Sequence, residues 1–226
     1  SVKKGSTEPT GDIVIPATVT YNDNEYRVTS IAYEAFKKCN SLASIYIPEG
    51  VTSIGMSAFD GCSSLTAFYG KFTSSDNRCL IINGVLNSFA PARLTEYTIS
   101  DNVTSIGECA FCDCSSLTSV IIPNSVTFIR DSAFRGCSSL TSITIPDSVT
   151  MIGHGAFEGC TSLESITIPN SVTEIGNIAF DGCMGELIIN SRAFVGKDYA
   201  YRSSPIDHNG WLNGNKFTRL AIGNSI

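Results

Sequence analysis

The sequence is poor in the side chains that most catalytic and nucleic-acid-binding sites require. Only 2 histidines and 1 tryptophan occur among 226 residues, and charged residues make up 16% of the chain. The 15 basic residues are outnumbered by 21 acidic ones and form no basic stripe, which argues against nucleic acids and anionic membranes as partners. No run of about 18 apolar residues occurs, so we expect no transmembrane segment. The 42% of hydrophobic residues excludes extensive disorder.

What the chain does contain is a repeat of 23 residues, clearest at residues 126–148, VTFIRDSAFRGCSSLTSITIPDS. Its most regular columns are a phenylalanine column and a cysteine column: Phe36, Phe59, Phe111, Phe134, Phe157 and Phe180, and Cys39, Cys62, Cys114, Cys137, Cys160 and Cys183. One such unit is too short to enclose a core. When units stack in register, each column becomes a ladder of identical side chains inside a solenoid.

Each repeat has the pattern of one strand, one tight turn and one short curl. Residues 140–145, LTSITI, end in an alternation of apolar and small polar residues, which is typical of a half-buried strand. Pro146 ends that strand, because proline lacks the N–H that a ladder needs. Residues 149–152 form a second short extended piece, and residues 155–160 have the spacing of a single 3₁₀ or α turn.

The pattern VTSIGxxAFxGCSSLTSITIPxS resembles the BspA-like leucine-rich repeats of bacterial surface and secreted proteins, over roughly residues 11–190. The resemblance implies a leucine-rich repeat solenoid of the α/β horseshoe class, rich in strands with short 3₁₀ or helical turns. About six 23-residue repeats and two widened coils are expected. For some members, the resemblance also implies attachment to host matrix proteins or to other bacteria.

We expect residues 1–226 to form one solenoid domain, because a solenoid grows without needing a second core. Its expected parts are an N-terminal cap hairpin at 11–27, repeats at 28–70, a hairpin insertion at 71–102, repeats at 103–190, and an irregular coil leading into a further repeat at 191–226. Asn83-Gly84 between two apolar runs is a strong hairpin signal, and we expect this hairpin to project from one face. Since the family contains similar inserts, we favour an architectural role for it over a dedicated site.

The two chain ends suggest a piece of a longer protein. The sequence starts with Ser1 instead of Met, and no signal peptide is recognisable, so we expect a processed or trimmed chain. The repeat pattern resumes at Phe217 and stops at Ile226, where another repeat begins.

Six of the nine cysteines belong to the cysteine column, and we expect them to be buried free thiols that pack as small hydrophobes. Cys109 and Cys112 resemble part of a metal cluster, but their columns are expected to face outward and no second ligand pair is suitably spaced. We therefore expect no metal and no cofactor. A surface disulfide between Cys109 and Cys112, or a simple thiol contact, is the alternative.

The two histidines do not indicate an active site. His154 occupies a column that varies freely, so we expect it to be exposed. His208 follows Asp207 directly in a turn-like loop, and adjacency in sequence does not produce triad geometry. We predict no catalytic residues.

Binding is better supported than catalysis. The outward positions of the strands are mostly small and polar, and the candidate contact residues among them are Tyr46, Tyr69, Ile121, Thr144 and Thr167. Tyrosine is a common anchor at interfaces, although Tyr46 and Tyr69 also suit a cross-strand pair. Trp211, in a glycine-flanked loop, is a further candidate; its alternative role is packing with Tyr199 and Tyr201.

The sequence therefore predicts a non-enzymatic, secreted or cell-surface module of a bacterium that binds protein or glycan partners, with an outer-membrane anchor as one form of attachment. We expect it to be a monomer. A passive spacer that presents another domain is the main alternative. A hydrolase with its site in residues 191–216 ranks below both.

Overall fold

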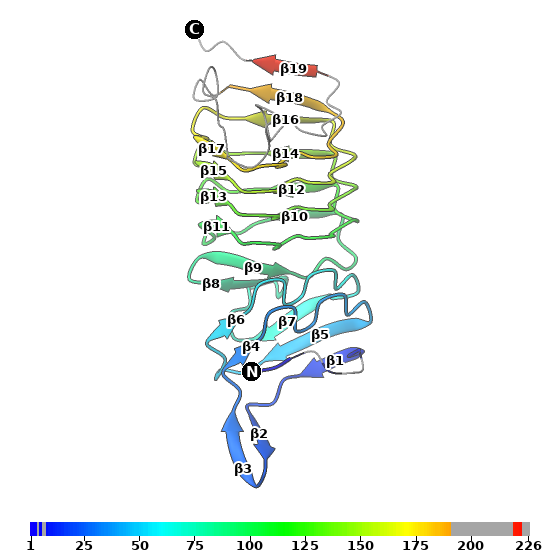
Figure 1. The fold of residues 1–226 in the computed structure, drawn as a ribbon, viewed down its shortest axis with the longest axis vertical. Coiled ribbons are helices and arrows are strands. Elements are labelled where there is room, and N and C mark those ends of the chain that lie inside the picture. Colours follow the sequence, from blue (N-terminus) through cyan, green and yellow to red (C-terminus); the bar gives the residue numbers. More distant parts are fainter. Residues whose placement is uncertain (4, 6–7, 191–218, 223–226) are drawn as a thin grey trace, which may run out of the picture.

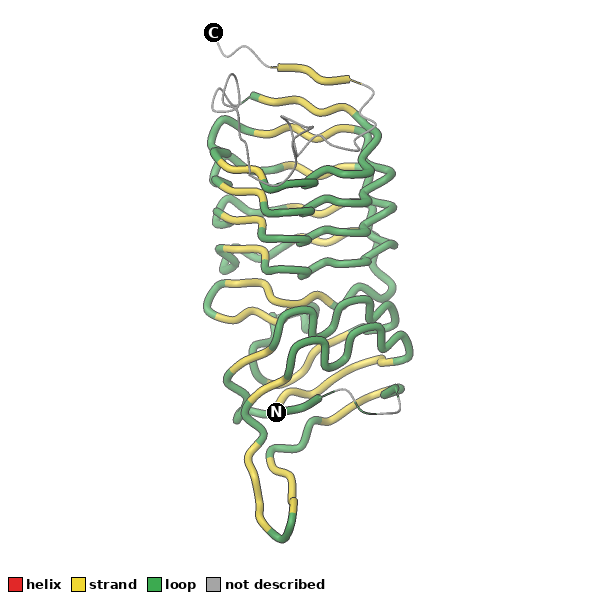
Figure 2. The backbone as a smooth tube through the Cα atoms, in the orientation of Figure 1, coloured by secondary structure: helices red, strands yellow, loops and turns green. Residues whose placement is uncertain are grey.

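The computed structural model describes residues 1–3, 5, 8–190 and 219–222 as a stack of coils, with the amino terminus near one end (Figure 1). A coil here means one circuit of the chain around the long axis. The described residues contain strands and turns but no helix (Figure 2). The predicted solenoid is thus confirmed.

Two sheets form opposite sides of the larger part of the stack, and their strands pair in parallel except for β8, which pairs antiparallel with β9. One contains, in spatial order, β10 (Glu96–Thr98), β12 (Ser119–Ile121), β14 (Ser142–Thr144), β16 (Ser165–Ile168), β18 (Glu186–Ile189) and β19 (Arg219–Ile222). The other contains β17 (Glu174–Ile175), β15 (Met151–Ile152), β13 (Phe128–Ile129), β11 (Ser105–Ile106), β9 (Val85–Phe89) and β8 (Cys79–Ile82). Residues 23 apart pair directly, as Ser119 does with Ser142 and Ile129 with Ile152. The sequence period is therefore the register of the sheets.

The remaining strands belong to a smaller stack at the amino-terminal end. It has a sheet of β1 (Gly11–Val14), β5 (Leu42–Ile47) and β7 (Ala67–Gly70), and a pair of β4 (Ser30–Ile31) and β6 (Ser53–Ile54). A hairpin of β2 (Thr18–Tyr21) and β3 (Asn24–Arg27) extends away from the coils (Figure 1). We call the coils of residues 11–70 the N-terminal stack and those of residues 96–189 the C-terminal stack.

The hairpin does not cover the end of the solenoid in the way the sequence suggested. Its two strands are almost entirely exposed. Instead β1 pairs with the edge of β5, and Val2 bridges Ile31 at the edge of β4. The open edges are therefore covered by extended chain laid along them, which satisfies their backbone hydrogen bonds directly.

The predicted helical turn at residues 155–160 is wrong. Gly155 and Gly159 have positive φ, which interrupts any helix. Every second backbone N–H of this curl donates to a carbonyl oxygen of the next coil. The N–H groups of Gly155, Phe157 and Gly159 do so at 3.0, 2.7 and 2.7 Å. The intervening N–H groups close four-residue turns, as from Glu158 to the Gly155 carbonyl at 3.0 Å. This curl thus hydrogen-bonds between coils much as a sheet does.

The inserted hairpin of β8 and β9 does not project from the surface, contrary to the expectation. It turns at Asn83-Gly84, and β9 pairs in parallel with β11. Leu80 packs into the core of the N-terminal stack and Leu86 into that of the C-terminal stack, both fully buried. Burial of apolar side chains from both strands holds the hairpin inside the solenoid, at the seam between the two stacks.

The phenylalanine ladder is buried as predicted but is divided at this seam. Phe36 stacks on Phe59 with ring centroids 5.2 Å apart, and Phe59 then meets Phe68 edge-on at 5.1 Å. A second ladder starts at Phe89 of the hairpin, whose ring lies 4.7 Å from Phe111. It continues through Phe134, Phe157 and Phe180 with spacings of 4.9, 5.3 and 5.6 Å.

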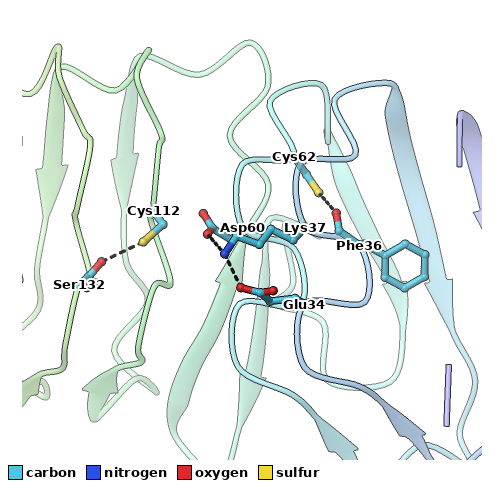
Figure 3. A network of polar contacts seen from close by, with 7 residues as sticks. All are labelled: Glu34, Phe36, Lys37, Asp60, Cys62, Cys112 and Ser132. Carbon is cyan, nitrogen blue, oxygen red and sulfur yellow. Dashed lines mark hydrogen bonds and ion pairs between the residues drawn. The ribbon is translucent and has the colours of Figure 1, made fainter. Parts of the chain in front are cut away.

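The cysteine ladder is confirmed as a ladder of free thiols, and it does more than fill space. Each of four thiols donates to the carbonyl oxygen of the phenylalanine one coil earlier. The pairs are Cys62 to Phe36 at 3.0 Å, Cys137 to Phe111 at 3.1 Å, Cys160 to Phe134 at 3.3 Å and Cys183 to Phe157 at 3.3 Å (Figure 3 shows the first). Cysteine suits this position because it is small, apolar and still a weak donor.

Candidate binding face

The outer side of the sheet β10–β19 presents two columns of small side chains. Alternation along each strand sends Val120, Ile143 and Ile166 into the core and their neighbours outward. The outward side chains of the three central strands carry no charge. They are Ser119, Ile121, Ser142, Thr144, Ser165 and Thr167, and we call this set the groove face.

A shallow groove runs over the groove face. Beside β12 and β14 it has a volume of about 420 Å³ and is walled by Asn124, Pro146 and Asp147 from the turns that follow these strands. It continues past β16 to Pro169 and Asn190. The repeated turn therefore builds one polar wall, and the repeated strand builds a floor of hydroxyls interrupted by Ile121, which is 59% exposed.

Tyr46 and Tyr69 form a second outward feature, in the N-terminal stack. They are direct partners on β5 and β7 and are 40% and 45% exposed. Gly70 has φ +85, and a Cβ there would lie 2.1 Å from the Ile47 carbonyl oxygen, so glycine is needed where β7 approaches β5 beside the Tyr46 ring. The structure thus brings the two tyrosines together.

These two features do not share one sheet. Tyr46 and Tyr69 lie in the three-stranded sheet of the N-terminal stack, while Ile121, Thr144 and Thr167 lie in the six-stranded sheet of the C-terminal stack. Trp211 and His208 lie outside the described residues. The predicted contact residues that are described therefore form two separate patches.

Sequence reasoning missed the exposed apolar residues of the amino-terminal hairpin. Val19, Tyr21 and Tyr26 on β2 and β3 are 46%, 68% and 50% exposed. Both tyrosines belong to the hairpin that turns at Asn22-Asp23, so the predicted hairpin could have identified them as exposed. His154 is exposed as predicted, and its backbone N–H donates to the Asp131 carboxylate at 2.9 Å.

The column of Cys112 does not face outward at the seam, contrary to prediction, whereas Cys109 is partly exposed. Cys112 is 4% exposed, and Asp60, at the same position of the regular repeat before the inserted hairpin, is 5% exposed. Asn87, Ser88 and the rest of the inserted hairpin line the same small cavity as these residues, so the hairpin covers positions that are more open elsewhere. The sequence does not show where the inserted hairpin lies in space, so it could not indicate that this hairpin covers Asp60 and Cys112.

Among the described residues, no group of three or more His, Cys, Asp or Glu side chains is arranged to hold a metal ion. Within the same residues, no helix is long and apolar enough to cross a bilayer.

The stacked coils, the 23-residue register and the strand-borne aliphatic ladder define a leucine-rich repeat solenoid. The sequence matches the family described as BspA type leucine rich repeat region in six copies, over residues 16–80 and 86–205. The chain therefore belongs to the BspA-type leucine-rich repeat family.

Solved structures agree with this assignment. A leucine-rich repeat protein of T. pallidum is 31% identical, with a TM-score of 0.50 and 76% of each chain covered. A leucine rich cell surface protein from Faecalibacterium prausnitzii is 18% identical, with a TM-score of 0.61, 99% of this chain covered and 90% of that one. A leucine-rich repeat protein from Eubacterium ventriosum is 21% identical, with a TM-score of 0.57; the match covers 93% of this chain and 54% of that one. No curated protein matches.

Proposed function

We propose that this protein is a non-enzymatic binding module of a bacterial cell-surface or secreted protein, and that it holds a protein or glycan partner against the groove face. The observation that carries the proposal is the uncharged, hydroxyl-rich floor that extends over three consecutive strands beneath one polar wall. The surface location follows the description of the Faecalibacterium prausnitzii protein, which shares the fold.

The chemistry of this floor suits the centre of an interface. Interface cores are depleted in charged residues, because a charge that loses water without gaining a partner is costly. Serine and threonine hydroxyls both donate and accept hydrogen bonds, and they lose little side-chain entropy when covered. A glutamate lies at each side of this uncharged floor. Glu96 on β10 pairs with Ser119, and Glu186 on β18 pairs with Ser165.

The proposal is tested by presenting the purified protein to a glycan array and, in parallel, to immobilised matrix proteins. Binding by one of these classes supports the proposal and identifies the partner chemistry. The double variant Thr144→Arg with Thr167→Arg places two long cations on the groove floor, and we expect it to lose roughly tenfold or more in affinity. Asn177→Arg, at an exposed turn after β17 on the other side, is the matched control and is expected to bind normally.

A second set of variants separates the tyrosine patch from the groove face. If the partner also contacts the N-terminal stack, Tyr46→Ala with Tyr69→Ala weakens binding, whereas Tyr21→Ala with Tyr26→Ala on the exposed hairpin does not. If neither the arrays nor the matrix proteins retain the protein, or if Thr144→Arg with Thr167→Arg binds as well as the wild type, the binding role of the groove face is rejected. A passive spacer then becomes the better description.

A further inference from the structure

Cys109 and Cys112 lie in a single turn at the seam between the two stacks. The backbone N–H of Cys112 donates to the Cys109 carbonyl at 3.1 Å, and the two side chains lie close enough to shift each other's pKa. Residues at the two ends of such a turn have Cα atoms within about 7 Å, which includes the range over which cysteines form a disulfide without backbone movement. The pair therefore has the spacing of a dithiol that closes easily.

The two thiols differ in accessibility and in acidity. Cys109 is partly exposed, whereas Cys112 is buried and its Sγ lies 3.2 Å from the Ser132 carbonyl oxygen (Figure 3). The hydrogen bond from Cys112, helped by one from Ser57, lowers the pKa of Cys109 to about 7 in spite of burial. The same hydrogen bond, together with burial, raises the pKa of Cys112. At neutral pH a large fraction of Cys109 is therefore the nucleophilic thiolate, with a protonated thiol beside it.

Charged and titratable groups from both neighbouring coils face this pair. Arg135, from the next coil, lowers the pKa of Cys109, and Asp60, from across the seam, raises it. Tyr33 also lies within electrostatic range of Cys109. Arg135 also acts to lower the pKa of Cys112, so the cation stabilises negative charge on either sulfur.

An independent observation at the same place is a buried carboxylate oxygen without a hydrogen-bond partner. Asp60 is 5% exposed; its Oδ2 lies 3.8 Å from the Lys37 ammonium, and its Oδ1 has no hydrogen-bond partner. Asp60, Cys109 and Cys112 line one small cavity, and Figure 3 shows Asp60 on the side of Lys37 that faces Cys112. Asp60 thus adds a buried carboxylate to the cavity that the two cysteines line.

We propose that Cys109 and Cys112 are a redox-active dithiol, which low-molecular-weight disulfides oxidise to an intramolecular disulfide. The Cys109 thiolate attacks a disulfide RSSR, forms a mixed disulfide and releases RS⁻, which takes a proton from solvent. Cys112 gives up its proton to the second leaving group as its sulfur attacks the Cys109 sulfur and expels RSH. The two protein sulfurs lose two electrons, and RSSR is reduced to two RSH.

The other cysteines provide an internal contrast. The remaining seven are Cys39, Cys62, Cys79, Cys114, Cys137, Cys160 and Cys183, each at most 3% exposed. Burial raises the pKa of Cys79, Cys114, Cys137, Cys160 and Cys183. Oxidation of the folded protein is therefore expected to be confined to the Cys109–Cys112 pair.

The test treats the folded protein with oxidised glutathione near neutral pH, quenches it with acid, and maps the thiols by mass spectrometry. We expect a Cys109–Cys112 disulfide in the wild type, and a mixed glutathione disulfide at Cys109 that accumulates in Cys112→Ser because no resolving thiol remains. Cys109→Ser is expected to form neither product. The double variant Cys109→Ser with Cys112→Ser keeps the other seven cysteines, and its oxidation measures the background reaction of those thiols.

A second measurement follows the rate of Cys109 alkylation by iodoacetamide against pH. The rate is expected to reach half its maximum near pH 7, where the lowered pKa lies. Arg135→Gln is expected to move this midpoint upward. Circular dichroism melts confirm that each variant folds, and the wild-type mapping requires no variant at all. The proposal is overturned if the wild type keeps both thiols reduced, or if the buried ladder thiols react as fast as Cys109.

Discussion

The two stacks are built from the same repeat, yet they bury it to different degrees. In the C-terminal stack the rings of Phe111, Phe134, Phe157 and Phe180 are all fully buried. In the N-terminal stack Phe36 and Phe59 retain 6% and 4% exposure. The ring contacts differ as well: Phe134 has a stacked ring on each side, and Phe36 stacks on Phe59. In a solenoid, part of the stability of each coil comes from its interfaces with the coils on either side.

The seam explains why the shorter stack is not simply a continuation of the longer one. Phe59 meets Phe68 edge-on, and the hairpin strand β9 supplies Phe89 as the first ring of the second ladder. The inserted hairpin thus ends one core and begins the next. The free energy of unfolding that is lost on substitution can be compared at corresponding positions of the two stacks. This comparison measures how much the division of the ladder destabilises the fold.

The largest effect is expected where a ladder ring has neighbours on both sides. Phe134→Ala removes a fully buried ring between two others and leaves a cavity, so we expect a loss of about 3–5 kcal/mol in the free energy of unfolding. Phe36→Ala, with one stacked ring, is expected to cost clearly less. Urea denaturation monitored by circular dichroism measures both.

Thr144→Ala serves as the surface control for this pair. Its side chain is exposed, so a change within about 0.5 kcal/mol is expected. Equal losses for Phe134→Ala and Phe36→Ala would show that stacking on both sides does not set the stability of a coil.

A smaller effect is expected from glycines at which one coil approaches another. A Cβ on Gly153, in the C-terminal stack, would lie 2.5 Å from the backbone nitrogen of Asp131 in the preceding coil. Gly153→Ala therefore forces two coils apart, and we expect a loss of about 1–3 kcal/mol. At Gly50, in the N-terminal stack, a Cβ would lie 3.2 Å from the Val28 carbonyl oxygen, so Gly50→Ala is expected to cost less.

Thermal melts of the two glycine variants rank them, and Gly5→Ala is the control because a Cβ there meets nothing within 4 Å. A larger fall in melting temperature for Gly50→Ala than for Gly153→Ala would contradict this ranking. It would also show that the N-terminal stack tolerates strain less well than its exposure suggests.

Most of the regular part of the fold was predictable from the sequence. Because identical side chains recur every 23 residues, the spacing of Val126, Val149 and Val172 already implied in-register stacking. The backbone of the curl was not predictable in the same way. Positive φ at Cys109, Ser132 and Ile178 shows that non-glycine residues also adopt the left-handed conformation there, which residue type alone did not indicate.

The candidate site was predictable only in part. Alternation along β14 and β16 correctly placed Thr144 and Thr167 on the surface, because period two is local. The burial of Cys112 and Asp60 was not predictable, because it depends on a hairpin from elsewhere in the chain that folds against the seam. The exposure of a side chain could be inferred where it depends on its own repeat. It could not be inferred where it depends on the inserted hairpin that interrupts the repeats.

The smallest predicted effect is at the seam itself. Burial, and then the nearby Asp113 carboxylate, raise the pKa of Asp60 above its ordinary value of 3.8. A raised folded-state pKa stabilises the fold below the ordinary value, and this contribution is lost as the pH rises through the raised pKa. Asp60→Asn cannot ionise, so its stability relative to the wild type is expected to increase from acidic to neutral pH. Urea denaturation of both proteins across this pH range measures the change, and a difference that stays constant would mean that Asp60 ionises as freely at the seam as it does in water.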